Sequence, residues 1–333
     1  MELELVKITY LLFILKNILR MCILIVCVSI FSFVLVSISP IDPVQANIGQ
    51  VALGTMSREQ VEKLELYWGV GEPLITRYVE WAKDFFRGDM GVSLLYRQNV
   101  SDIILEKLHN SLMLMTTAWI ISGVFGFILG IIAGANQGSF VDKLIKTYSL
   151  LIASTPAFWL ALVLIMVFSV WLNILPIGFG VPIGVEAANV TLSDRIRHII
   201  LPALTLGITG ISNIALHTRA KMIDVMQSDY VLFAMARGES KWSIIKNHGI
   251  RNVSLPAITL QFASISEIFG GSILVEQIFS YPGLGQTAVT AGIGSDVPLL
   301  LGIAIISATI VFVGNFIANI LYVSIDPRIR RGL

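Results

Sequence analysis

The sequence predicts an all-α polytopic membrane protein with six transmembrane helices. Three observations lead to this fold class. Of the 333 residues, 55% are hydrophobic and only 14% are charged, whereas soluble domains carry about 25% charged residues. Apolar runs recur along the chain, and roughly 20 such residues are needed for one helix to cross a bilayer. Lys and Arg gather in alternate loops between these runs.

The six apolar runs are expected to cross the membrane as helices. The first run is too long for a cleaved signal peptide and has no small-residue cleavage site before Pro40, so we expect it to be retained. In the second run, Gly123, Gly126, Gly130 and Gly134 recur at helical spacing and are expected to pack closely against another helix. The predicted spans are approximately Leu11–Ser39, Leu108–Ala135, Thr147–Leu175, Ile199–Leu216, Val253–Val275 and Leu299–Val323.

The basic residues predict the orientation of these spans. The loop 217–252 contains six Lys and Arg residues against three acids, and both ends of the chain are also basic. In contrast, residues 276–298 contain two acids and no base, and the long segment 41–102 has more acids than bases. Because loops on the cytoplasmic side carry the excess of Lys and Arg, we expect the amino and carboxyl termini to lie in the cytoplasm.

The spans and loops divide the chain into four expected parts. The long segment before the second span is expected to fold outside the membrane. The parts are an amino-terminal transmembrane helix (1–40), an external cap domain (41–102), a core of five transmembrane helices (103–325) and a cytoplasmic tail (326–333).

The expected cap domain contains two helical patterns. Ser57 is followed three residues later by Gln60, which is the spacing of a capping box. A second pattern places Tyr78, Trp81 and Phe85 on one stripe and ends at Gly88, as expected of an amphipathic helix.

The loop 217–252 is expected to form two short helices that break at Gly238. Apolar residues gather on one face of each half, namely Val231, Ala234 and Met235 in the first and Trp242, Ile244 and Ile245 in the second. A basic amphipathic element beside a membrane can lie on anionic lipid headgroups. It can also dock into a soluble partner, and the small residues Ala234, Ala236 and Gly238 favour this alternative because they permit close backbone approach.

Five segments of the sequence resemble one transporter family. The pattern Ala234-Met235-Ala236-Arg237-Gly238, followed by Ile250 and Leu255-Pro256, resembles the loop of binding-protein-dependent ABC importer permeases that docks on the ATPase. Its A-x-A-x-G form is similar to that of the dipeptide, oligopeptide and nickel branch. The other segments that resemble this branch are 85–94, 154–179, 270–286 and 326–330.

The resemblance implies a fold, a location and a set of partners. The fold would be that of a type I ABC importer permease with an extra amino-terminal helix and a small external domain, in the cell membrane of a prokaryote. The chain would form half of the translocation pathway beside a second homologous permease subunit. Two cytoplasmic ATPase subunits, an extracytoplasmic substrate-binding protein and membrane lipid would complete its partners, with no nucleic acid. Substrates of the branch are dipeptides, oligopeptides, nickel and other metal chelates, including opine-like metallophores.

The same resemblance assigns the ATPase-docking surface to the loop 217–252. Glu239 departs from the family pattern, in which an apolar residue commonly follows the glycine. The docking residues that the resemblance implies are Tyr230, Ala234, Met235, Ala236, Arg237, Gly238, Glu239 and Trp242.

The chain itself is not expected to be an enzyme or to bind a cofactor. It contains no G-x-x-x-x-G-K-[ST] phosphate loop, so ATP and Mg would be bound by the partner ATPases. Its four histidines are scattered without the spacing of metal ligands, which gives no support for a metal site.

Glu267 is the candidate for substrate contact in the membrane. It lies near the middle of the fifth span, where a carboxylate costs about 2.5–3.5 kcal/mol and should face a partner or a wet cavity. Gln261 and Ser264 precede it on a polar stripe. Glu267 could line the pathway and favour a cationic group, or it could hydrogen-bond within the permease pair as a structural group.

Two further interpretations concern the turn after the fifth span and an alternative function. The turn after the fifth span is expected to shape the outer mouth of the pathway. The alternative function is a secondary transporter without ATPase partners, which would be expected to show paired broken helices in repeated halves. The outer-mouth candidates are Tyr281, Pro282, Gly283 and Gly285.

Overall fold

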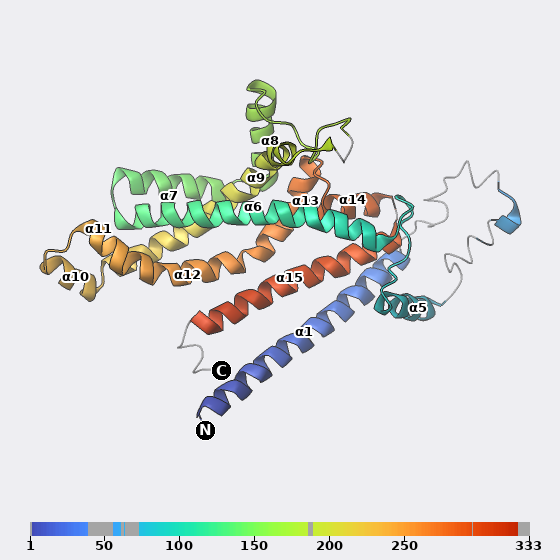
Figure 1. Ribbon diagram of the computed structural model, residues 1–333, viewed down its shortest axis with the longest axis horizontal. Helices are drawn as coiled ribbons and strands as arrows, with labels where there is room; N and C mark the ends of the chain where they lie inside the picture. The colour runs from blue at the N-terminus through green and yellow to red at the C-terminus, as the bar shows by residue number, and fades with distance from the viewer. Residues whose placement is uncertain are drawn as a thin grey trace. The chain divides into compact units, whose positions relative to one another are not determined.

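Helices make up most of the described part of the chain in the computed structural model of the protein (Figure 1). Within that part the only extended pairing is an isolated bridge between Val92 and Asn99. The structure describes residues 2–38, 56–60, 63, 73–185, 189–294 and 296–325.

Four helices in the described residues are each long and apolar enough to cross a membrane. Two bent helix pairs pass the same test only when their halves are taken together, so the described residues give four spans, or six if each pair forms one span. The count of six agrees with the prediction. The four single helices are α1 (Glu2–Ile38), α6 (Val100–Ala135), α9 (Leu192–Met226) and α15 (Val297–Ile325).

The third predicted span, Thr147–Leu175, is wrong as a single helix. α7 (Phe140–Ala153) ends before Pro156, and the chain turns by 106° into α8 (Ala157–Leu164) and the π-helical segment η1 (Ile165–Trp171). Proline has no N–H to donate and disfavours a helical conformation in the residue before it. The break follows from this local chemistry.

The fourth and fifth predicted spans also differ from the structure. α9 begins well before the predicted Ile199, because Thr191 and Asp194 form a reciprocal capping box at its start. The fifth span is divided at Ser264 into α12 (Ile250–Ala263) and α13 (Ile265–Ile278), with a bend of 45°.

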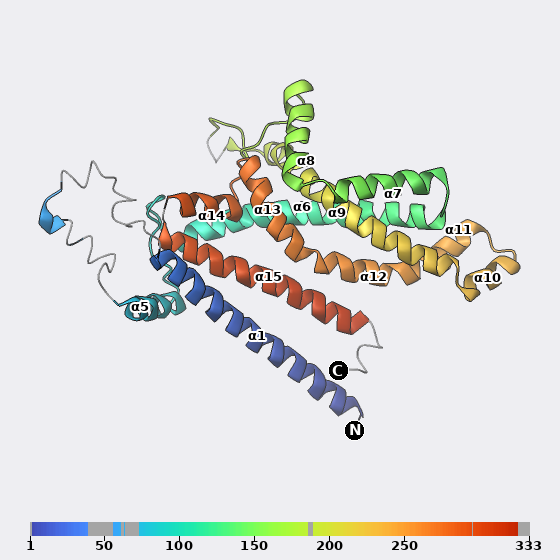
Figure 2. The same cartoon turned by 180° about the vertical axis from the view of Figure 1, so that it is seen from behind.

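The chain divides into two compact units. One consists of residues 1–110 and 283–313, and the other of residues 111–282 and 314–333. In the second unit α9 is central, since it contacts α7, α8, α12 and α13. Figure 2 shows α9 and α12 running together towards the loop that joins them.

The glycine stripe of α6 packs directly against α9, as predicted. A Cβ atom added to Gly126 would lie 2.8 Å from Cβ of Ile214, and one added to Gly130 would lie 2.5 Å from Cβ of Thr218. Both values are far below ordinary carbon–carbon contact, which is about 3.5–4.0 Å. The absence of side chains therefore sets how closely the two helices approach.

A bidentate ion pair joins α7 to α9. Arg219 donates from Nε to Oδ1 of Asp142 at 2.5 Å and from its NH2 group to Oδ2 at 2.8 Å. The Asp142 side chain is only 3% exposed and also accepts from the N–H of Gly138 at 2.8 Å. Planar, paired bonds of this kind fix orientation as well as distance.

The other unit is held by an apolar cluster and one buried carboxylate. Val100 and Ile103 of α6 pack with Leu299 of α15 and with α14 (Leu284–Ile293), a helix that the sequence analysis did not predict. Fully buried Asp296 accepts from the Ser93 hydroxyl at 2.5 Å and from the N–H groups of residues 94, 95 and 299 at 2.9–3.2 Å. This carboxylate ties the segment before α6 to the start of α15.

The described parts of the predicted cap domain agree with the expected local patterns. Ser57 donates its N–H to the Gln60 side chain at 3.0 Å, and Gln60 donates its N–H to the Ser57 hydroxyl at 3.3 Å. α5 (Leu74–Phe86) carries the predicted aromatic stripe and is followed by Gly88, whose φ is +89°. Most of residues 39–72 and the tail 326–333 lie outside the described residues, so the cap domain as a whole remains a prediction.

Candidate coupling surface and translocation pathway

The loop between α9 and α12 folds as a helical elbow. α10 (Asp229–Ala236) ends in a turn at Gly238, and α11 (Lys241–Ile244) continues through the π-helical η3 (Ile245–Gly249) into α12. Gly238 has a φ of +83°, which L side chains rarely adopt. The predicted pair of short helices broken at this glycine is confirmed.

The inner face of the elbow packs against the end of α9. Val231, Ala234 and Ile244 are at most 4% exposed and form a cluster with Val225 and Met226 of α9. Ala234 was expected to contact a partner, but in the structure its side chain is covered by this packing.

The outer face of the elbow is apolar and exposed. Met235 and Trp242, which were expected to share a face with the buried residues, point outward instead and are 44% and 69% exposed. Ala236 and Gly238 are exposed beside them. We define the coupling surface as Tyr230, Leu232, Phe233, Met235, Ala236, Gly238 and Trp242.

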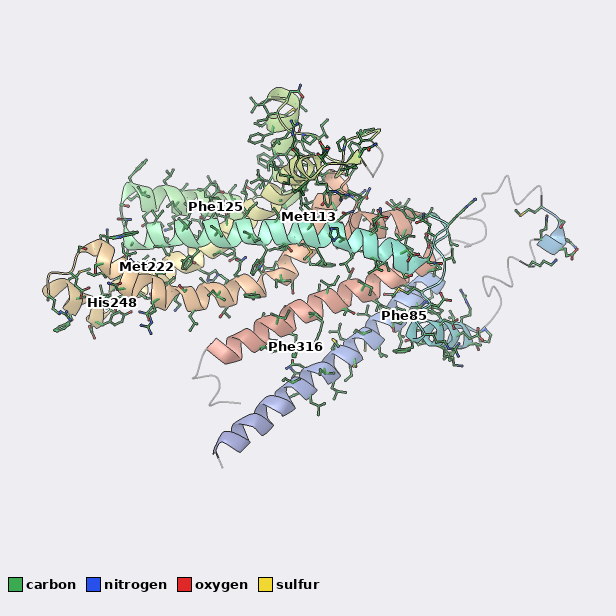
Figure 3. All side chains as sticks on the ribbon, viewed as in Figure 1. Phe85, Met113, Phe125, Met222, His248 and Phe316 are labelled. Atoms are coloured by element: carbon green, nitrogen blue, oxygen red, sulfur yellow. The ribbon has the colours of Figure 1, made fainter. Side chains whose placement is uncertain are left out.

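Charged residues border the coupling surface. The Arg237 guanidinium lies 6.0 Å from the centre of the Phe233 ring. Glu239 lies 3.7 Å from Nε2 of His248 and accepts from the Ser243 hydroxyl at 3.5 Å. Figure 3 labels His248 and Met222 at this end of the unit. An exposed apolar patch with a polar rim is typical of a protein docking surface.

Side-chain bonds hold the elbow to the neighbouring helices. Lys241 donates to the Asn136 side chain at 2.8 Å, and Gln227 donates to Gln137 at 3.0 Å, so the elbow is attached to the turn between α6 and α7. Asn252 of α12 donates to the Tyr230 hydroxyl at 3.3 Å. A displacement of the elbow would therefore be passed on to α6, α9 and α12.

Glu267 lies in the first turn of α13, directly after the break at Ser264. It borders a cavity of about 320 Å³ in which Thr155, Thr209 and Asn213 supply further polar groups. Asn213 Nδ2 lies 3.5 Å from the carboxylate. The cavity is adjacent to both helix breaks of this unit, at Pro156 and at Ser264.

The predicted pathway residues do not all meet at this cavity. Ser264 lines it together with Glu267. Gln261 is instead a buried brace between α6 and α12, because it donates to the Trp119 carbonyl at 2.6 Å while the Trp119 indole donates to the Gln261 carbonyl at 2.8 Å. The Gln261 side chain borders a separate, mainly apolar cavity of about 450 Å³.

The predicted outer-mouth residues are mostly packed. Tyr281 is 4% exposed, and Gly283 and Gly285 are also buried. The N–H of Tyr281 donates to the Glu276 carbonyl at 2.8 Å. Burial, and then the Glu276 carboxylate, raise the pKa of Tyr281 to about 12, because both disfavour a phenolate. The Tyr281 hydroxyl therefore stays neutral at physiological pH.

Sequence reasoning missed three polar residues near these sites. Glu276 was counted only as an acid in a loop, but it is fully buried and accepts from the Ser111 hydroxyl at 2.7 Å. Thr209 and Asn213 are polar residues in a mainly apolar run of α9, and they were the available signal for the cavity.

Comparison with known families gives two matches that together cover most of the chain. Residues 126–331, more than half of the chain, match the family described as binding-protein-dependent transport system inner membrane component. Residues 10–115 match the amino-terminal part of membrane components of the same transport systems. The second match includes residues 10–38 of the extra amino-terminal helix, α1.

Curated proteins resemble the chain over almost its full length. It is 36% identical to the oligopeptide transport system permease protein AppB of Bacillus subtilis (strain 168), over 91% of this chain and 94% of that protein. It is 33% identical to the di/tripeptide transport system permease protein DppB of Pseudomonas aeruginosa (strain UCBPP-PA14), over 91% of this chain and 94% of that protein.

Proposed function

Since the chain belongs to the family of binding-protein-dependent transport system inner membrane components, it is a multi-pass permease subunit of an ABC importer, and we propose that the coupling surface binds a cytoplasmic ATPase. Membership of this family favours the ATP-driven importer over the secondary transporter. Permease subunits of such importers carry no cofactor of their own. The expected partners are a second permease subunit, two ATPase subunits and an extracytoplasmic binding protein. We also expect both termini of this chain to lie in the cytoplasm.

The observation that carries this proposal is the exposed apolar face of the elbow. Phe233 and Trp242 are 65% and 69% exposed, although the surrounding charges place the loop outside the hydrocarbon core. Large exposed aromatic side chains bordered by polar groups are characteristic of interface anchors. The opposite face of the same elbow is buried on α9, so a force on the outer face would reach the transmembrane helices.

Coupling then follows from the attachments of the elbow. When ATP closes the ATPase dimer, the bound elbows approach each other, and α9 and α12 move with them. The two helix breaks beside the Glu267 cavity, between α7 and α8 and between α12 and α13, are positions at which these helices can change their direction. A ligand shifts the equilibrium between two conformations of a protein only by its differential affinity for them. Here the ligand is ATP, and it binds to a partner chain.

Peptides are the substrate class that we propose. The two relatives described above are named as oligopeptide and di/tripeptide permeases. Glu267 would attract the ammonium group of a peptide amino terminus, and Ser264 and Asn213 would offer hydrogen bonds to its backbone. Nickel and metallophores remain alternatives from the same branch. Uptake of labelled peptides and of free and chelated nickel, with and without this gene, separates these substrates.

Aspartate substitutions on the coupling surface test the docking. We expect Phe233→Asp and Trp242→Asp to reduce co-purification of the ATPase with the permease and to reduce peptide uptake. Phe140→Asp is the matched control, because Phe140 is 79% exposed but lies at the start of α7, outside the coupling surface. ATPase retention equal to wild type in both elbow variants would contradict the docking assignment.

A further inference from the structure

α5 carries two apolar strips side by side. Tyr78 and Trp81 belong to the strip that faces α1, and Phe85 lies where α5 meets α1 (Figure 3). The second strip stays uncovered: Ile75 and Phe86 are 78% and 84% exposed. Val79 is spaced one turn from Ile75 and two turns from Phe86 and is 41% exposed. The two strips form one wide apolar face, and among the described residues only the aromatic strip packs against another helix.

The contacts with α1 place α5 at the edge of the membrane. The Ser29 hydroxyl lies 2.8 Å from the Tyr78 hydroxyl, and the Phe33 ring centre lies 5.4 Å from that of Tyr78 and 6.1 Å from that of Trp81. Ser29 and Phe33 belong to the last two turns of the spanning segment Ile14–Leu35. A helix that packs against those turns lies at the depth of the bilayer interface.

The residues around the exposed strip are those expected at the membrane interface. Ile30, Phe31 and Leu35 of α1 are 45–66% exposed at the same level and would face lipid. Tyr and Trp are the residues that favour the membrane interface, and the aromatic strip supplies both. The opposite face of α5 is polar, with Glu80 and Asp84 exposed.

We propose that α5 lies in the interface of the membrane, with Ile75, Val79 and Phe86 inserted among the lipids. An amphipathic helix with one apolar and one charged face binds a bilayer in this way. Lys83 is exposed beside the apolar strip, where its ammonium group can contact a lipid phosphate, whereas Arg87 is paired with Asp84 of the polar face at 3.3 Å. With the cytoplasmic termini proposed above, the leaflet is the outer one.

Depth measurements on spin labels test this anchor in the assembled importer in lipid nanodiscs. Cys22 and Cys27 are free and exposed, so both are first changed to serine. Labels are then attached in Ile75→Cys and Phe86→Cys, with Glu80→Cys as the matched control on the polar face. We expect the labels at 75 and 86 to collide more with oxygen than with a water-soluble nickel chelate, and the label at 80 to show the reverse.

Two results would overturn the proposal. Water accessibility at 75 and 86 equal to that at 80 would place the strip in solvent. Exclusion of both reagents at 75 and 86, either always or after addition of the binding protein, would show that protein covers the strip instead of lipid. Peptide uptake and ATPase co-purification, measured on the same samples, report separately on the proposed function, because neither depends on where α5 lies.

Discussion

Replacing Gly130 with alanine should force α6 and α9 apart. The new Cβ atom would lie 2.5 Å from Cβ of Thr218 and 2.8 Å from the carbonyl oxygen of Ala215. Ordinary carbon contacts are about 3.5–4.0 Å, so the shortfall at Thr218 is about 1 Å. One of the two neighbours is a backbone atom, which no side-chain rotation can move out of the way.

The cost follows from this geometry. Overpacking a tightly packed site costs about 1–3 kcal/mol, and the fixed carbonyl places Gly130→Ala in the upper part of that range, at about 2–3 kcal/mol. Gly126→Ala should cost less, because its closest approach is 2.8 Å and its backbone neighbour lies at 3.0 Å.

The free energy of unfolding, measured by titration with a denaturing detergent, checks this order. Gly270→Ala is the control, since a Cβ atom at this helical position would meet nothing within 4 Å. Gly130→Ala and Gly270→Ala gain the same helix propensity of about 1 kcal/mol. The difference between their unfolding free energies therefore gives the cost of overpacking at position 130. Equal stability of Gly130→Ala and Gly270→Ala would refute the reasoning.

Three other predictions concern the ion pair, the elbow and the cavity. Asp142→Asn should cost about 3 kcal/mol of unfolding free energy, because it leaves the guanidinium of Arg219 partly buried without its carboxylate. Asp224→Asn, which removes only the exposed partner of Lys221, should cost clearly less in the same titration, and equal losses would contradict this. Ala236→Arg and Gly238→Trp should leave the helices inserted and ATP hydrolysis active while peptide uptake falls, and normal uptake in vesicles would remove these residues from the docking surface. Glu267→Gln should raise the KM for peptides about tenfold or more, since a charge-assisted hydrogen bond contributes about 1.5–3 kcal/mol; an amino-acetylated peptide should show no such change, and an unchanged KM for free peptides would favour a structural role.

Several parts of this structure could be predicted from local patterns. Spanning helices depend on the length of apolar runs, and the break at Gly238 depends on a single residue that tolerates a positive φ. The packing role of Gly130 followed from spacing alone, because small residues at one helical face permit close approach of a second helix.

The features that the sequence analysis missed are of two kinds. Some depend on contacts between residues far apart in the sequence, and others are helix breaks or side-chain orientations that the spacing of apolar residues does not determine. The bend before Pro156 was hidden by the continuous apolar pattern around it, and the break at Ser264 has neither Pro nor Gly to mark it. The bond between Ser111 and Glu276 joins residues 165 positions apart. Likewise, which apolar side chains of the elbow face inward depends on where α9 lies, so Trp242 could not be assigned to the exposed face in advance.

The hydrogen bonds to Asp296 suggest how the segment before α6 could be replaced by the corresponding segment of a related permease. One carboxylate receives the Ser93 hydroxyl together with two successive backbone N–H groups and the first turn of α15. Backbone donors are supplied by almost any sequence, so the junction demands little more than a hydroxyl at position 93 and an acid at position 296. A related permease could therefore donate its own segment in a chimaera that keeps these two residues, and the outer region could diverge during evolution while the junction stays the same.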